Sequence, residues 1–223
     1  MEKNRIIGSI VCNSLVVVVV TISVILSLFG ILVDDPNSAG VHTFRYFTTD
    51  SNIFAAICCL IMLLYDIKAL RNSEYKIPNW VIKLKFISTV AVAVTFLVVL
   101  CYMAPVGGFA KLYYGTSFFL HLVAPLLAIV SLVFFDPPVF LSGKFCFLGV
   151  LPMAVYSVIY FVMVITLGES NGGWEDFYHF NEGGLYLVSL FSMYISTITF
   201  CYVFNVLRNL ATHKYRVPDI VYS

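Results

Sequence analysis

Two groups of polar side chains interrupt long apolar stretches of this 223-residue chain, and both groups have residue types that can carry out chemistry. The first is a run of five hydrogen-bonding residues from Thr48 to Asn52, and the second is one histidine, His121. A threonine hydroxyl becomes a nucleophile when a neighbouring neutral imidazole removes its proton. The two groups together would therefore form a minimal nucleophile–base pair if the fold brings them close.

The composition indicates which solvent surrounds these groups. The chain is 61% hydrophobic and only 11% charged, whereas about a quarter of the residues in soluble domains are charged. Such a chain requires lipid as its solvent. The net charge of +1 argues against a basic nucleic-acid-binding protein, so we expect no nucleic-acid partner.

The apolar stretches are long enough to be membrane-spanning helices, which need about 20 mostly apolar residues. The first stretch is too long for the core of a cleaved signal peptide, so we interpret it as a retained span. The linkers are too short for a separate soluble domain. The sequence therefore predicts an all-α, polytopic membrane protein with one domain, residues 1–223, and six spans, at about 6–33, 44–66, 79–104, 113–135, 145–167 and 184–207.

The distribution of basic residues predicts the orientation, because cytoplasmic loops carry the excess of Lys and Arg. With a cytoplasmic N-terminus, only Arg45 and Lys111 of the 13 basic residues lie on the outer side. Both termini are therefore predicted to be cytoplasmic. We interpret the inner cluster as a determinant of this orientation, with binding of anionic headgroups as an alternative; it comprises Lys68, Arg71, Lys76, Lys83 and Lys85.

The polar run lies at the outer end of the second predicted span. Thr48, Ser51 and Asn52 share one helix face, at spacings of three and four residues. An alternative role for Thr49 and Asp50 is helix capping, which explains Asn52 less well because it lies a turn deeper. The face continues inward with small residues that let another helix approach, Ala55 and Cys59.

His121 lies inside the fourth predicted span, on the order of 12 Å below its outer boundary at 1.5 Å per residue. Ser117, Pro125 and Ala128 fall on the same face. Pro125 removes the backbone bond that the His121 carbonyl would otherwise accept, so we expect a kink there. The alternative is a buried histidine that only fixes helix packing.

Topology connects the two groups, because the second and fourth spans both run from outside to inside. Thr48 and His121 are therefore predicted to lie in the same outer half of the membrane. We predict supporting roles for Asp50, which could orient the histidine, for Ser51 or Asn52 as oxyanion donors, and for Ser117. The outer loop 169–184 is either an interfacial aromatic belt or a lid over this site.

Two local motifs resemble a known family. The segment Phe44-Arg45-Tyr46-Phe47-Thr48-Thr49-Asp50-Ser51-Asn52 resembles the start of the second span in the androgen-induced and androgen-dependent membrane hydrolases. The fourth-span segment Leu120-His121-Leu122-Val123-Ala124-Pro125, followed by Phe135-Asp136-Pro137, is similar to the uncharacterised bacterial six-span relatives of that family. The residues after Thr48 depart from the animal pattern and are closer to the bacterial group.

The resemblance implies a hydrolase of lipid (fatty-acid) esters, with Thr48 as nucleophile and His121 as base. Its partners would be membrane lipids and a lipid ester substrate, and its location a bacterial cytoplasmic membrane. We expect no metal and no organic cofactor, because the six cysteines lie in apolar runs without metal-binding spacing. The alternatives are a small transporter or lipid-binding protein that uses the same polar pocket without catalysis, and a structural protein whose polar residues only fix packing.

Overall fold

The fold is a bundle of membrane-spanning helices. The computed structural model describes residues 3–33, 35–137, 141 and 143–213. All regular secondary structure in this part of the chain is helical, and six helices are long and apolar enough to cross a membrane. The protein is therefore an all-α, six-span membrane protein, as the sequence predicts. The spans are Lys3–Leu28, Phe47–Arg71, Asn79–Met103, Gly115–Phe135, Phe147–Leu167 and Tyr186–Ala211.

The first two spans differ from their predicted boundaries at the end where the candidate site lies. Helix α1 (Lys3–Leu28) ends before residue 33, because Gly30 and Leu32 adopt left-handed backbone conformations that stop a helix. Residues Gly40–Arg45 form a separate 3₁₀ helix, η2. Helix α2 therefore begins at Phe47 rather than at residue 44, and it continues to Arg71.

The fourth span is continuous but irregular in its winding. It consists of α6 (Gly115–Phe118), the π-helical turn η4 (Phe119–Val123), α7 (Ala124–Val130) and a second π-helical turn, η5 (Ser131–Phe135). In η4 the Ala124 N–H donates to the Phe119 carbonyl, five residues back. The distortion that the sequence predicts near Pro125 takes this form, since proline cannot supply the regular helical donor.

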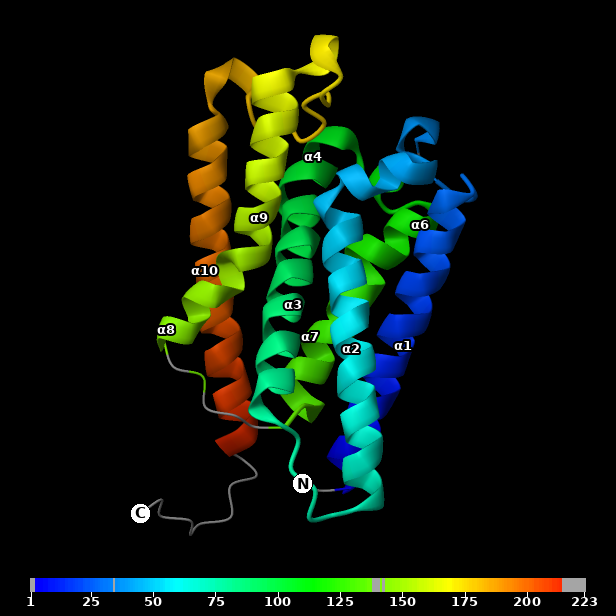
Figure 1. Cartoon of the computed structure of the whole chain (residues 1–223), viewed down its shortest axis with the longest axis vertical. Helices are drawn as coiled ribbons and strands as arrows, with labels where there is room; N and C mark the ends of the chain where they lie inside the picture. Colours follow the sequence, from blue (N-terminus) through cyan, green and yellow to red (C-terminus); the bar gives the residue numbers. More distant parts are fainter. Residues whose placement is uncertain (1–2, 34, 138–140, 142, 214–223) are drawn as a thin grey trace.

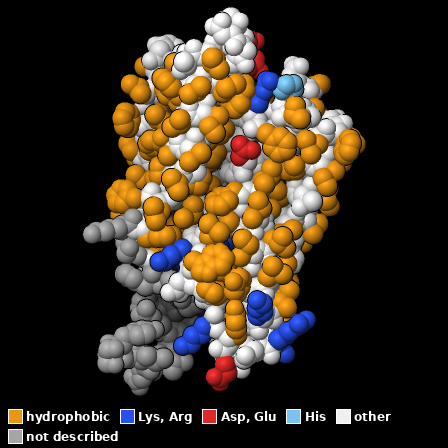
Figure 2. All heavy atoms as spheres, viewed as in Figure 1, with side chains coloured by type: hydrophobic (Ala, Val, Ile, Leu, Met, Phe, Trp, Pro, Cys, Tyr) orange, Lys and Arg blue, Asp and Glu red, His pale blue; other side chains and the backbone are white. Residues whose placement is uncertain are grey.

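Helix α3 (Asn79–Val98) lies in the middle of the bundle, where it contacts α2, α7, α9 (Leu151–Tyr160) and α10 (Tyr186–His213) (Figure 1). The first and last described residues lie at the same end of the bundle (Figure 1). On the visible face, basic side chains gather mainly toward that end and apolar side chains cover the middle (Figure 2). This arrangement agrees with the predicted orientation, so we refer to the two ends as inner and outer.

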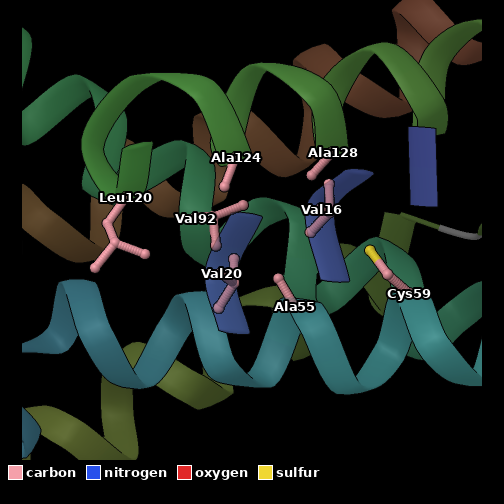
Figure 3. Packing of buried hydrophobic residues seen from close by; sticks show 8 residues of the cluster. All are labelled: Val16, Val20, Ala55, Cys59, Val92, Leu120, Ala124 and Ala128. Carbon is pink, nitrogen blue, oxygen red and sulfur yellow. The ribbon is translucent and has the colours of Figure 1, made fainter. Parts of the chain in front are cut away.

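The centre of the bundle is a layer of buried small and branched side chains from four spans (Figure 3). None is more than 4% exposed. Ala55 and Cys59 of α2 belong to it, so their predicted role in close helix approach is confirmed. We call this set the apolar layer; its members are Val16, Val20, Ala55, Cys59, Val92, Leu120, Ala124 and Ala128.

Candidate functional site

A cavity of about 370 Å³ lies at the outer end of the bundle, where α2 begins. Thr48 and His121 both line its wall, so the two reactive groups selected from the sequence face one space. The remaining wall comes from the outer ends of the spans and from the connecting loops. It includes Ser27, Thr43, Tyr46, Thr49, Met103, Lys111, Leu112, Thr116, Ser117 and residues 175–179.

Thr48 is the second residue of α2 and is 8% exposed. Its side chain is hydrogen-bonded to the hydroxyl of Tyr178, from the loop before α10. The Tyr178 hydroxyl accepts a hydrogen bond from the Phe47 N–H at 3.0 Å and is also bonded to the Thr48 side chain. Burial raises the pKa of Tyr178, against the opposing effect of these hydrogen bonds. Tyr178 therefore presents a neutral hydroxyl beside Thr48.

The orientation of His121 follows from one strong hydrogen bond. Its Nδ1 lies 2.7 Å from the Leu112 carbonyl oxygen, in the segment that leads into the fourth span. A carbonyl only accepts, so Nδ1 carries the proton in this contact and Nε2 is the basic nitrogen of the neutral ring. The ring also meets Tyr113 edge-on, with centroids 6.4 Å apart. These two contacts fix the orientation of the imidazole at the cavity wall.

Asn52 connects the two reactive groups through the backbone. Its Nδ2 donates to the Thr48 carbonyl at 2.8 Å and to the Leu120 carbonyl at 3.0 Å. Asn52 is completely buried. It therefore fixes the start of α2 against the turn that carries His121, and its amide hydrogens are used in this role. The sequence-based prediction gave it an oxyanion role instead, which these bonds do not favour.

The other predicted supporting residues differ in where they lie. Ser117 lines the cavity. Ser51 is buried and bonds to the Thr95 hydroxyl at 3.0 Å and to the Thr48 carbonyl at 3.2 Å, so it joins α2 to α3. Asp50 is exposed. Neither Ser51 nor Asp50 is among the described residues that form the cavity wall.

The loop before α10 folds over the cavity and contributes Glu175–His179 to its wall. The Asp176 carboxylate accepts hydrogen bonds from the Tyr160 hydroxyl at 2.6 Å and from the N–H groups of Phe180 and Asn181 at 3.0 and 2.8 Å. Aromatic rings of this loop pack on Tyr160. Of the two alternatives for this loop, the contacts favour a cover over the site.

A lateral groove of about 500 Å³ runs between α3 and α10, at membrane depth, and is lined mainly by apolar side chains. A smaller pocket lies between the outer cavity and the lateral groove and shares lining residues with each of them. Thr48, Met103 and Tyr178 line both the outer cavity and this pocket. This pocket and the groove share four lining residues, Val94, Val98, Phe180 and Met193. This pocket itself has a volume of only about 20 Å³, so it would have to widen before an apolar chain in the groove could reach Thr48.

The inner half of the bundle contains a second polar group that the sequence analysis missed. Lys85, which the sequence analysis assigned to membrane orientation, is 0% exposed, and its Nζ donates to the Cys59 Sγ at 2.9 Å. A charged residue inside the predicted span 79–104 was the available signal. We call this group the inner polar cluster; its members are all 0% exposed and comprise Ser9, Asn13, Asp66, Lys85, Ser131 and Asp136.

The residues that the structure describes contain no group of three or more His, Cys, Asp or Glu side chains that could hold a metal ion. The fold and the outer cavity define a six-span membrane protein with a polar site under the loop before α10. Comparisons with protein-family models, with curated proteins and with solved structures find no significant match to the chain.

Proposed function

We propose that the protein is an intramembrane hydrolase of lipid esters, with Thr48 as nucleophile and His121 as general base. One observation carries the proposal. The two residue types that the chemistry requires, selected from different spans, line the same outer cavity. The hydrogen bond from His121 Nδ1 to the Leu112 carbonyl supports it, because a neutral ring with its proton on Nδ1 has Nε2 as its basic nitrogen.

The reaction would proceed through an acyl-enzyme. The Thr48 Oγ attacks the ester carbonyl carbon while His121 Nε2 takes the hydroxyl proton. The tetrahedral intermediate then breaks its bond to the alkoxy oxygen, which leaves as an alcohol with the proton from His121. Water, deprotonated by His121, attacks the acyl-threonine, and its collapse releases the fatty acid and returns the proton to the Thr48 hydroxyl. The net change is ester plus water to acid plus alcohol.

The negative oxygen of the intermediate needs a hydrogen-bond donor. The Tyr178 hydroxyl suits this role, because it is neutral and adjoins Thr48 while the Phe47 N–H donates to its oxygen. The Ser117 hydroxyl at the cavity wall is a second donor. Asn52 and Ser51 are positioning residues in this proposal, because their hydrogen bonds join α2 to neighbouring spans.

The lateral groove supports a lipid substrate. Its apolar lining lies at membrane depth, and the small pocket that shares its walls reaches Thr48. An acyl chain from the outer leaflet would lie in the groove with its ester at Thr48. The polar cavity on the other side of Thr48 would receive the alcohol portion of the ester, which leaves toward the outer surface.

A transporter is the second candidate function, and the inner polar cluster favours it. Buried ionisable residues in membrane spans commonly serve ion or proton pathways. However, the apolar layer lies between the outer cavity and the inner cluster, and every member is at most 4% exposed. Transport would require this layer to open, whereas hydrolysis at the outer cavity requires no such movement. We therefore favour the hydrolase.

The test is hydrolysis of a panel of lipid esters by the purified protein in lipid nanodiscs. Thr48→Ala and His121→Ala should each lower the rate by about a hundredfold or more. The matched controls are Thr199→Ala and His42→Ala, exposed residues outside the cavity wall, which should keep the wild-type rate. Full activity in both site variants would refute the mechanism. Flux of a solute across sealed vesicles without hydrolysis would favour the transporter.

A further inference from the structure

The inner polar cluster is centred on Ser9 of α1, whose hydroxyl lies between two carboxyl groups. Ser9 Oγ is 2.6 Å from Asp66 Oδ2 and 3.1 Å from Asp136 Oδ1. The Asn13 Nδ2 also donates to Ser9 Oγ, at 3.0 Å. Both carboxyl side chains are completely buried. Three spans therefore meet at a single hydroxyl.

Counting hydrogens shows that these contacts need one more proton than ionised side chains provide. A serine hydroxyl has one hydrogen, and an ionised carboxylate can only accept. The Asn13 amide supplies the hydrogen of its own contact. If both aspartates were ionised, one of the two contacts of Ser9 would join two oxygens with no hydrogen between them. Such a contact is costly where little solvent is present to screen it.

A proton on Asp66 resolves the deficit. Asp66 Oδ2 then donates to Ser9 across 2.6 Å, and Ser9 donates to Asp136 Oδ1, which also accepts from the Ser131 hydroxyl at 2.8 Å. Every short contact then contains one hydrogen. The second oxygen of each carboxyl group, Asp66 Oδ1 and Asp136 Oδ2, is buried and has no hydrogen-bond partner among the described residues. A neutral carboxylic acid tolerates this far better than a carboxylate does. These two oxygens therefore favour a proton in the pair, and the surrounding charges decide which aspartate holds it.

The surrounding charges also distinguish the two aspartates. Arg5 donates from Nη2 to the Asp136 backbone carbonyl at 3.0 Å, and Arg208 of α10 donates to the next carbonyl, that of Pro137. These cations therefore lie beside the backbone of Asp136, so the other carboxyl group, that of Asp66, is the better place for a proton. The remaining titratable groups that face the two carboxyls are Lys85 and the thiols of Cys12 and Cys59.

We propose that Asp66 is a proton-binding residue: it holds a proton that it donates to Ser9, which in turn donates to Asp136. The site is independent of the hydrolase proposal, because the apolar layer lies between it and the outer cavity. Buried acids with a defined partner are the groups through which membrane proteins bind and release protons. The inner end of the bundle thus has its own ligand, a proton.

Infrared spectroscopy of the full chain in nanodiscs tests this inference. A protonated carboxylic acid has a carbonyl stretching band separate from that of carboxylates, and the band shifts in D₂O. At neutral pH the wild-type protein should show one such band. Asp66→Asn should lose it completely. Asp50→Asn, an exposed carboxylate at the outer end, and Asp136→Asn should keep it.

Absence of the band in the wild type, or its loss in Asp136→Asn but not in Asp66→Asn, would overturn the proposal. A band that appears only after sodium and potassium are replaced by choline would also overturn it, because the cluster would then bind a metal cation. If Asp66→Asn does not fold, Ser9→Ala decides the question. The band must shift in that variant if Asp66 donates to Ser9, and an unshifted band would contradict the assignment.

Discussion

The two polar sites of this protein are built from the same spans but differ in what surrounds them. At the outer end, Thr48 and His121 line a cavity of about 370 Å³ under a loop. At the inner end, Ser9, Asp66 and Asp136 are 0% exposed and bond to one another. The apolar layer, whose side chains Figure 3 shows, lies between these two regions along the spans. The outer site therefore has room for an organic substrate, whereas the inner site is arranged around a proton.

The largest expected effect is a loss of stability from a substitution that changes only the inner polar cluster. Asp136→Asn removes the carboxylate that lies beside Arg5, Arg208 and Lys85, so buried positive charge loses its compensation. We expect a loss of about 3–5 kcal/mol in the free energy of unfolding. Chemical denaturation in detergent micelles measures it. Asp50→Asn, at an exposed position, should change stability by no more than about 0.5 kcal/mol. Equal stability of Asp136→Asn and wild type would show that the inner carboxylate is not ionised.

The next effect concerns the bridge between α2 and the fourth span. Asn52→Leu removes both donated bonds and leaves the buried Leu120 carbonyl without its donor. We expect a loss of about 1–3 kcal/mol in stability, together with a lower hydrolytic rate in the folded fraction. Asn171→Ala, an exposed asparagine that bonds within its own segment, is the matched control. An Asn52→Leu variant with unchanged rate would remove Asn52 from the positioning role.

A smaller effect is expected at Tyr178. Tyr178→Phe keeps the ring but removes the hydroxyl beside Thr48, so we expect about a tenfold lower rate if it assists the oxyanion, equivalent to about 1.4 kcal/mol. Tyr114→Phe, at an exposed position outside the cavity wall, should keep the wild-type rate. A wild-type rate in Tyr178→Phe would assign the oxyanion to another donor.

The same residue predicts a pH dependence of stability. Burial holds the folded pKa of Tyr178 above the value of about 10 in an unfolded chain. The folded protein therefore keeps the phenol proton that the unfolded chain releases, so stability falls as the pH rises above about 10. Tyr178→Phe should show a shallower fall in this range. Identical pH profiles of the two proteins would contradict the burial of this hydroxyl.

The smallest expected effect is on KM, and it tests whether the acyl chain of the substrate lies in the lateral groove. Met193→Trp narrows the lateral groove, so KM for long-chain esters should rise several-fold relative to short-chain esters, since each buried methylene contributes about 0.8 kcal/mol. Ile195→Trp, on an exposed face of the same helix, is the control. An equal effect on both chain lengths would show that the acyl chain lies elsewhere.

The sequence predicted the spans and the outer pair because each depends on one local signal. Apolar length marks the spans, and a polar residue inside a span marks Thr48 and His121. The inner polar cluster escaped because it depends on how α1, α2 and the fourth span are rotated, which no local pattern specifies. Lys85 was assigned to membrane orientation from its position near the end of a span, and Asp66 was not singled out. Asn52 was placed on the correct face, but its partners are backbone carbonyls that only the packing defines.

The central claim is that Thr48 is the nucleophile and His121 its base. Labelling with a fluorophosphonate probe, followed by identification of the modified peptide by mass spectrometry, tests it most directly. We predict modification at Thr48 in the wild type, loss of labelling in Thr48→Ala and strongly reduced labelling in His121→Ala. Modification of a different residue, or labelling of Thr48 that does not depend on His121, would contradict the account.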